Sequence, residues 1–321
     1  MIEALRFVKG AVAKKDFNPI LTHYLIRSGR VTGCNGRMTI SSPINLDIEA
    51  APKAEALVKA IDMCEEALSI HLTAANRLAI RSGKFKAFID CHTEIDTFPE
   101  VEPKGDRHTL GCPIIPCLKE LHPFLGVDAS REWCNTYLFT PDGCVTATNN
   151  ICMIQKFIGR AFPEPLALSW DIASELIRIG KEPESFSLTD RDITFYYPQE
   201  RWMQSVRRVA NWTEDYSSIL DRQYEYRPIP DGLFTSLRKI SKFAEEHQLV
   251  YFDGKGCRTQ KEEEAGVSVE FDGAPERGVY NVSQLLLWEG IADRIDFSAY
   301  PNPIGLAGKN MRGVMVGAID G

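Results

Sequence analysis

Apolar residues recur at helical spacing near the start of each third of the chain. In the first third, Ile2, Leu5, Val8 and Val12 lie three or four residues apart. This spacing places them on one face and predicts an amphipathic helix. The same kind of pattern predicts further helices at 54–66, 116–125, 169–179, 233–246 and 281–292. Each third of the chain therefore carries two predicted helices.

Short apolar runs between these helices predict β-strands. The runs are 23–26, 38–40, 68–72, 78–82, 85–91, 133–139, 144–148, 186–189, 193–197, 249–252, 267–271, 295–298 and 313–316. The order helix, strands, helix, strands thus occurs three times, which indicates an internal repeat. The pattern predicts an α+β fold of three repeated domains at 1–106, 107–221 and 222–321, joined through the charged stretch 102–107 and the polar stretch 221–227.

Composition is that of an ordinary globular protein, with 44% hydrophobic and 25% charged residues. No run approaches the roughly 20 apolar residues that a membrane helix needs, and the charged N-terminus does not resemble a signal peptide, so we expect a cytoplasmic protein with no membrane partner. The nine cysteines include no C-x-x-C pair; Cys112 and Cys117 are the closest. Reduced thiols are expected, with neither a metal site nor a cofactor.

The net charge of −7 argues against binding of nucleic acid only if the charges are evenly spread over the protein. On the helix at 233–246, the apolar face comprises Leu233, Leu237, Ile240 and Phe243. The opposite face carries Arg238, Lys239 and Lys242. By the same geometry Lys59, Lys119 and Arg178 oppose the apolar faces of their own helices. These side chains are candidate phosphate contacts, or else ordinary solvated faces.

Four segments carry a resemblance to a known family, the bacterial DNA polymerase III beta subunit, which is the DNA sliding clamp. They are NPILTHYLI at 18–26, RLAIRSGKFKAFI with DTFPEV at 77–101, DYSSIL at 215–220 and VYNVSQLLLWEGI at 279–291. The segments resemble, in the same order, the early turn of that family, the end of its first domain, the end of its second and a helix of its third. The chain is thereby identified as a divergent relative over nearly its whole length.

The resemblance implies a DNA-binding role in replication without catalysis. Members are homodimers that close head-to-tail into a ring around double-stranded DNA and contact it regardless of sequence. The helices line the central hole, so the cationic positions above would face phosphates. Lys15 matches a basic loop residue that touches DNA in the family; alternatively it complements the helix dipole. DNA polymerase and the clamp loader would dock through short peptide motifs.

The resemblance also places a pocket for these peptides. The positions that match it are Cys134, Thr148, Asn150, Met153, Leu220, Val314 and Val316. Residues 149–152 (Asn-Asn-Ile-Cys) depart from the family's pattern, and so does the C-terminal sequence VMVGAID, where Gly317 and Ala318 replace bulkier residues. The pocket is therefore expected to be shallower or tuned to other peptides. Alternatively, Met153 and the two valines are plain core.

Two other functions remain open from the sequence. A clamp-like protein or decoy could occupy clamp partners without encircling DNA, and the altered C-terminus is compatible with that. An enzyme could use Cys91 and His92 or another Cys/His pair, although the sequence has no phosphate-binding loop, dinucleotide motif, zinc-protease motif or nucleophile elbow. We expect a clamp rather than an enzyme.

Overall fold

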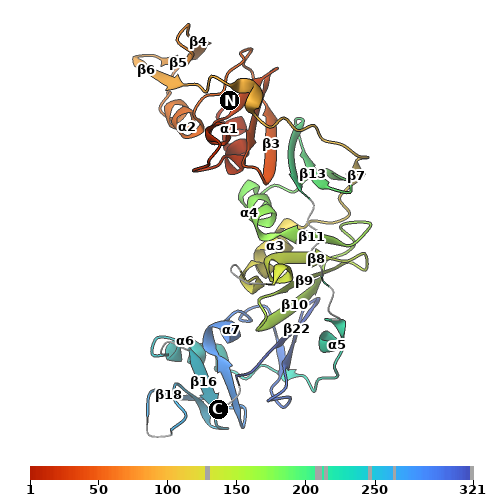
Figure 1. Ribbon diagram of the computed structural model, residues 1–321. Helices are drawn as coiled ribbons and strands as arrows, with labels where there is room; N and C mark the ends of the chain where they lie inside the picture. The colour runs from red at the N-terminus through yellow and green to blue at the C-terminus, as the bar shows by residue number, and fades with distance from the viewer. Residues whose placement is uncertain (127–130, 207–211, 213–215, 245–247, 263–264, 319–321) are drawn as a thin grey trace. The chain divides into compact units, whose positions relative to one another are not determined.

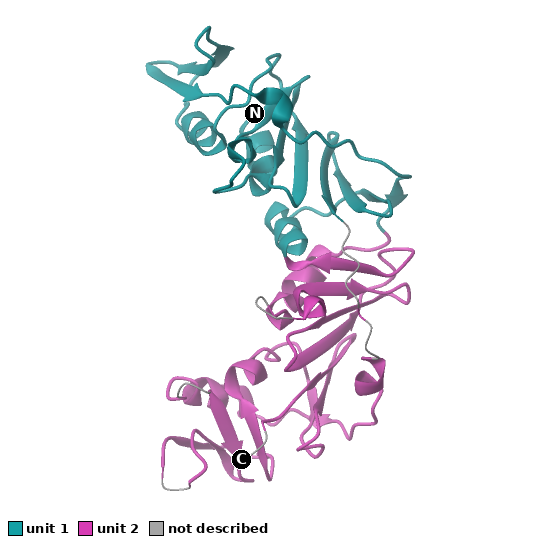
Figure 2. Cartoon of the chain, in the orientation of Figure 1, with its two compact units in different colours: residues 1–110, 171–208 teal, residues 111–170, 209–321 magenta. Residues whose placement is uncertain are grey.

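The computed structural model describes residues 1–126, 131–206, 212, 216–244, 248–262 and 265–318. These residues form helices and antiparallel sheets (Figure 1). The chain divides into two compact units, residues 1–110 with 171–208 and residues 111–170 with 209–321 (Figure 2). The middle third thus contributes to both units, because its strands extend two different sheets. The predicted division into three domains is not tested by this division into two units and remains a prediction.

Unit 1 is built on a seven-stranded antiparallel sheet in the order β1-β2-β3-β14-β13-β12-β7. Its strands are β1 (Leu25–Arg27), β2 (Arg30–Cys34), β3 (Met38–Pro43), β7 (His108–Thr109), β12 (Ser185–Leu188), β13 (Asp192–Tyr197) and β14 (Arg201–Val206). A second sheet orders β4 (Leu68–Leu72), β5 (Arg77–Ser82) and β6 (Phe85–Asp90). The helices are α1 (Ile2–Val8), α2 (Ala54–Asp62) and, apart from its first residue, α4 (Trp170–Ile179).

Unit 2 is built on an eight-stranded antiparallel sheet in the order β11-β8-β9-β10-β22-β21-β20-β15. Its strands are β8 (Thr136–Phe139), β9 (Cys144–Thr148), β10 (Cys152–Phe157), β11 (Leu166–Ser169), β15 (Arg227–Pro228), β20 (Arg294–Asp296), β21 (Ile304–Gly308) and β22 (Met311–Met315). A four-stranded sheet orders β18 (Ser268–Glu270), β17 (Gly256–Arg258), β16 (Leu249–Phe252) and β19 (Gly278–Asn281). The helices are α3 (Ile115–Leu121), α5 (Ser217–Leu220), α6 (Leu233–Ile240) and α7 (Val282–Leu286).

Short 3-10 turns complete the described elements. In unit 1 they are η1 (Lys9–Ala11), η2 (Pro19–Thr22) and η3 (Ile95–Thr97), and in unit 2 they are η4 (His122–Phe124) and η5 (Glu132–Asn135). The first half of the strand predicted at 133–139 lies in η5, so only its second half enters the sheet, as β8.

Aromatic packing fixes the core of unit 2. The Trp288 side chain is fully buried and meets the Phe124 ring edge to face at a centroid distance of 4.8 Å. Its indole lies over Gly313 of β22, where a Cβ atom would come within 2.3 Å of the ring. Glycine is therefore required at this position so that Trp288 can pack on the sheet. This packing covers one face of the sheet. The strand residues that are predicted to bind peptides project from the other face.

The helices form where the sequence predicts them, but several are shorter: α2 ends at Asp62 instead of residue 66, and α3 ends at Leu121 instead of residue 125. Leu57, Val58 and Ile61 are buried on α2, as their spacing requires. In contrast, α6 ends at Ile240, so the prediction that Phe243 belongs to its apolar face is wrong: that side chain is 59% exposed. Residues 245 and 246 of the predicted helix lie outside the described residues. The last predicted helix, 281–292, is helical only over Val282–Leu286.

No helix in the described part of the chain is both long and apolar enough to cross a membrane.

Candidate nucleic-acid interface and peptide site

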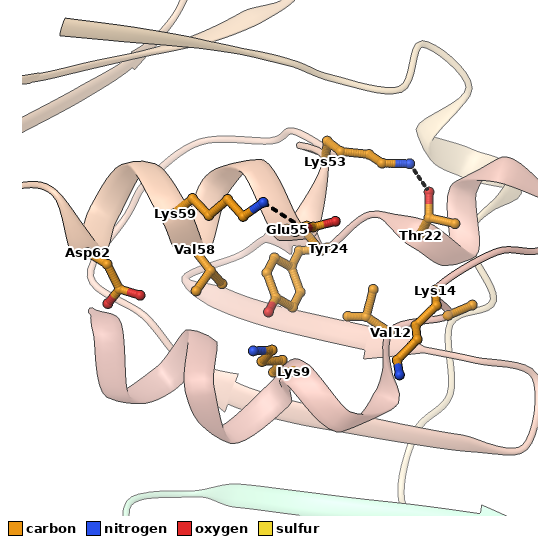
Figure 3. Close-up of a pocket in the computed structure, with 12 residues that line it drawn as sticks. Lys9, Val12, Lys14, Thr22, Tyr24, Lys53, Glu55, Val58, Lys59 and Asp62 are labelled. Carbon is orange, nitrogen blue, oxygen red and sulfur yellow. Dashed lines mark hydrogen bonds and ion pairs between the residues drawn. The ribbon is translucent and has the colours of Figure 1, made fainter.

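A cavity of about 510 Å³ opens between α1 and α2 of unit 1 (Figure 3). Its apolar lining includes Val12, Tyr24 and Val58. Four lysines and two carboxylates also line it: Lys9, Lys14, Lys53, Lys59, Glu55 and Asp62. Because the cations outnumber the anions, the cavity attracts a negatively charged ligand.

Ion pairing leaves this cationic excess largely in place. The Lys59 ammonium lies 2.7 Å from the Glu55 carboxylate, one helical turn away, and the pair is highly exposed. This contact lowers the pKa of Glu55, so the carboxylate stays ionised. Lys53 donates a 2.8 Å hydrogen bond to the Thr22 hydroxyl, which is neutral. Lys59, a predicted phosphate contact, therefore lies at the rim of a site with net positive charge.

The predicted DNA contact Lys15 is exposed in the loop that follows η1. Asp16 orders this loop, because its carboxylate accepts a 2.9 Å hydrogen bond from the backbone N–H of Asn18. Phe17 lies between Asp16 and Asn18 in the sequence, and its side chain is completely exposed. Sequence reasoning passed over Phe17, although an aromatic residue beside two lysines is a recognisable signal.

Arg178 has a different setting from the other predicted phosphate contacts. Its guanidinium forms two charged contacts with Glu175 and donates to the carbonyl oxygens of Arg6 at 2.9 Å and Phe7 at 2.7 Å. These carbonyls lie in the last turn of α1, whose C-terminal carbonyls have no partner within the helix. Arg178 thus joins α4 to α1, and its DNA contact stays a prediction.

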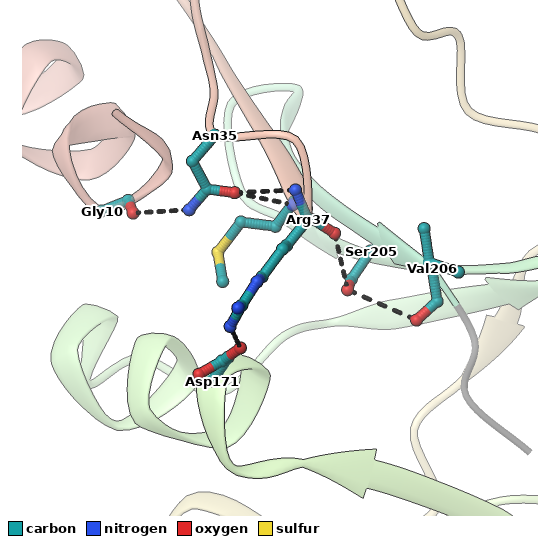
Figure 4. A network of polar contacts seen from close by, with 7 residues as sticks. Gly10, Asn35, Arg37, Asp171, Ser205 and Val206 are labelled. Atoms are coloured by element: carbon teal, nitrogen blue, oxygen red, sulfur yellow. Dashed lines mark hydrogen bonds and ion pairs between the residues drawn. The ribbon is translucent and has the colours of Figure 1, made fainter. Parts of the chain in front are cut away.

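A polar network holds the start of α4 in unit 1 (Figure 4). Arg37 in the β2–β3 turn forms an ion pair with Asp171 in the first turn of α4. Asn35 shapes that turn by accepting hydrogen bonds from the backbone N–H groups of Arg37 and Met38, both at 3.0 Å. Ser205 of β14 donates to the Arg37 carbonyl at 3.2 Å. The position of α4 is therefore fixed at both ends.

In unit 2, the cationic residues predicted on α3 and α6 are exposed. Lys119 lies opposite the buried Leu118 and Leu121 of α3. On α6, Lys239 is exposed and Lys242 follows the helix end, also exposed. Arg238 forms an ion pair with Glu289 and donates to the Thr235 hydroxyl at 3.3 Å. The helices of each unit thus bury their apolar side and present cations on the other.

Three of the predicted peptide-pocket residues lie in one row across the large sheet of unit 2. Met153 of β10 pairs with Thr148 of β9 on one side and with Val314 of β22 on the other. Directly paired residues of antiparallel strands project from the same face of the sheet. The register therefore places Val314 beside Met153 and Thr148, although it lies far from them in the sequence, and the peptide pocket at these positions stays a prediction.

The remaining predicted pocket residues differ in exposure. Leu220 is buried at the end of α5, next to Asp221, whose carboxylate binds Arg312 of β22 at 2.6 Å. Cys134 is fully buried in η5. Val316 is exposed, and its backbone N–H donates to the Ile151 carbonyl at 2.9 Å. The C-terminal segment thus continues along the turn that bears Asn150.

The turn at 149–152, where the sequence departs from the family, is held by a residue that sequence reasoning did not select. Asn149 accepts hydrogen bonds from the backbone N–H groups of Ile151 at 3.0 Å and Cys152 at 2.7 Å. Its side-chain amide donates to Gln284 of α7 at 2.6 Å. Asn150 adopts a φ of +73°, a conformation that asparagine tolerates better than most residues. Asparagines thus build this turn.

Cysteine nucleophiles are not favoured by these surroundings. Burial raises the pKa of the Cys91 thiol, and it raises that of Cys117 and of Cys152 to about 12. A thiol must ionise to attack, so raised pKa values oppose catalysis. No group of three or more potential metal ligands occurs among the residues that the structure describes.

Neither a protein-family model nor a curated protein sequence matches this chain. Solved structures do match it. The DNA polymerase sliding clamp of Bacillus subtilis has a TM-score of 0.81 at 16% identity, with 100% of this chain and 97% of that chain covered. The beta subunit of DNA polymerase from Streptococcus pyogenes gives 0.83 at 14% identity, covering 99% and 97%.

A third match carries information on ligands. The Helicobacter pylori beta clamp, solved with a DNA ligase peptide bound, gives a TM-score of 0.78 at 15% identity, covering 99% of this chain and 97% of that chain. Identities this low establish the fold alone. Over its full length, this chain has the fold of the bacterial DNA polymerase sliding clamps.

Proposed function

We propose that this chain is a DNA sliding clamp, a non-enzymatic processivity factor that encircles duplex DNA and tethers a DNA polymerase in the cytoplasm. The observation that carries the proposal is the clamp fold over the full length, with cationic helix faces in both units. Lys15, Lys59, Lys119, Arg238, Lys239 and Lys242 would meet phosphates, and Arg178 would do so more weakly because its guanidinium already binds within unit 1. Such contacts are independent of base sequence, which allows sliding.

Ring closure would come from a head-to-tail homodimer. The sheet β4-β5-β6 in unit 1 and the sheet β18-β17-β16-β19 in unit 2 each end, within the described residues, on strands with one strand neighbour. Phe88 on β6 is exposed, as is Phe243 just beyond α6. Strand edges with a free side and exposed aromatic side chains are each suited to contact with another chain. A heterologous contact of this kind closes into a ring when its rotation allows it.

The proposal is tested by retention on DNA. The protein is loaded on a primed circular template by the matching loader, and the template is then cut. A topologically linked ring should remain bound to the circle and be released once free ends exist. Equal retention on the cut and uncut template would contradict encirclement, and a protein that elutes as a stable monomer would favour the decoy function.

Charge reversal on α6 is expected to shorten residence on the circle. The variant carries Arg238→Glu, Lys239→Glu and Lys242→Glu, which replaces attraction to phosphates by repulsion. We expect residence to fall by roughly tenfold or more, while the thermal unfolding temperature falls only modestly, since the three side chains are exposed and the Arg238–Glu289 ion pair that is lost lies near the surface. The matched control reverses three exposed turn cations, Lys181, Arg191 and Lys309. Equal decreases in both triple variants would mean that α6 does not face DNA.

Peptide docking would use the row formed by Thr148, Met153 and Val314. The change Met153→Glu places a charge between two buried neighbours, so an apolar peptide side chain can no longer pack there. We expect binding of a fluorescent peptide from the tail of the cognate polymerase to weaken roughly 30-fold or more. Phe157→Glu, at the other end of the same strand, is the control and should bind normally. Normal binding by the Met153 variant would place the docking site elsewhere.

A further inference from the structure

One aromatic side chain of unit 1 projects from a loop into solvent. Phe17 has a relative exposure of 108%, so its ring is fully in water. The loop around it is nonetheless held by backbone hydrogen bonds, from Leu21 to the Asn18 carbonyl at 3.1 Å and from Ala13 to the Leu21 carbonyl at 3.0 Å. The Asp16 interaction with the Asn18 N–H adds a third constraint. Phe17 is thus presented on a fixed support.

Phe17 is close in sequence to several exposed cations. Lys14 and Lys15 precede it in the same loop, and both are exposed. Lys14 also lines the cavity between α1 and α2, together with Lys9, Lys53 and Lys59 (Figure 3). An exposed aromatic side chain in the same loop as a lysine of a cationic cavity offers the two features that proteins use for unpaired nucleic acid strands: a face on which bases can stack, and charge for the phosphates.

We propose that Phe17 and this cavity together bind single-stranded DNA. An unpaired base stacks on the Phe17 ring, and adjoining backbone phosphates lie among the lysine ammonium groups of the cavity. A duplex does not offer its base faces, which are already stacked on neighbouring pairs, so Phe17 selects an unpaired strand. The inference rests on the proposed function, which sets unit 1 against DNA, and adds that the clamp holds the single strand at a primer end.

The test compares a 16-nucleotide oligo-dT with a 16-base-pair duplex, using fluorescence anisotropy and the full-length protein. Phe17→Ala should weaken oligo-dT binding by roughly 5- to 100-fold, the range for removal of one base-aromatic stack. Duplex binding should change by less than twofold. Phe157→Ala removes another exposed phenylalanine and is the control. Circular dichroism checks that each variant is folded.

A second variant tests the cavity. Lys9→Gln with Lys14→Gln should reduce the slope of log K against log salt for oligo-dT, by about 0.7 for each phosphate that is no longer neutralised. The inference is overturned if Phe17→Ala binds oligo-dT like the parent, if Phe157→Ala weakens binding as much, or if the salt slope is unchanged. If the protein is retained on circular DNA but Phe17→Ala binds oligo-dT with unaltered affinity, only this inference is overturned. If oligo-dT binding depends on Phe17 but the protein is not retained on circular DNA, only the proposed clamp function is overturned.

Discussion

Replacing Phe88 with aspartate is expected to convert the proposed ring into monomers. Phe88 lies on β6, opposite Ala79 of β5, and is 51% exposed. Lys86 is placed over its ring at 4.8 Å from the centroid, so the aromatic surface is only partly covered. In the proposed head-to-tail interface, an aspartate here would be buried without a partner. Aromatic residues at the centre of an interface are typical of positions that dominate its energy.

The effect should be large because the ring would contain this interface twice. If each interface is weakened by about 2 kcal/mol, the closed dimer is weakened by about 4 kcal/mol, which is roughly a thousandfold in its dissociation constant. Light scattering after size exclusion at micromolar concentration should then give the mass of one 36.1 kDa chain rather than two. Phe157→Asp, which alters an exposed phenylalanine of unit 2, should leave the dimer intact. A Phe88→Asp protein that stays dimeric would place the interface at another surface.

Residues with strong periodicity show how much of the fold the sequence predicts. The helix predicted at 169–179 is observed as α4 over Trp170–Ile179, and the strands predicted at 144–148 and 249–252 have their predicted bounds. These segments have clear apolar patterns and end at turns, so local information suffices. The repeated order of elements also led to the clamp fold that the structural matches support.

Other strands were missed because their residues are explained only by distant neighbours. β21 reads Ile-Gly-Leu-Ala-Gly, which is typical of a turn rather than a strand. Yet a Cβ at Gly305 would come within 2.4 Å of the Tyr224 ring, so glycine there permits packing by a segment about 80 residues earlier. Similarly, no local pattern gives the register that pairs Met153 with Val314, and the resemblance only assigned both positions to one pocket.

Arg178→Ala is expected to destabilise unit 1 by roughly 2–4 kcal/mol. The Glu175 side chain is only 7% exposed and binds the guanidinium, which is itself 38% exposed. Removing one partner of a buried ion pair leaves a charge without compensation, and water entering from the exposed side offsets part of that cost. The Arg6 and Phe7 carbonyls lose their donors as well. The sequence did not predict this role, since helical spacing shows only that Arg178 opposes the apolar face.

Thermal unfolding and hydrogen exchange measure this destabilisation, which should appear as faster exchange in α1 and α4. Lys119→Ala changes an exposed helix cation that has no such interactions with the residues the structure describes, and it should alter the unfolding free energy by less than about 0.5 kcal/mol. Adding Glu175→Gln to Arg178→Ala should recover part of the stability, because an amide is cheaper to bury than a carboxylate. An Arg178→Ala protein that unfolds like the parent but leaves DNA faster would instead make Arg178 a phosphate ligand, because only its interaction with DNA would then have changed.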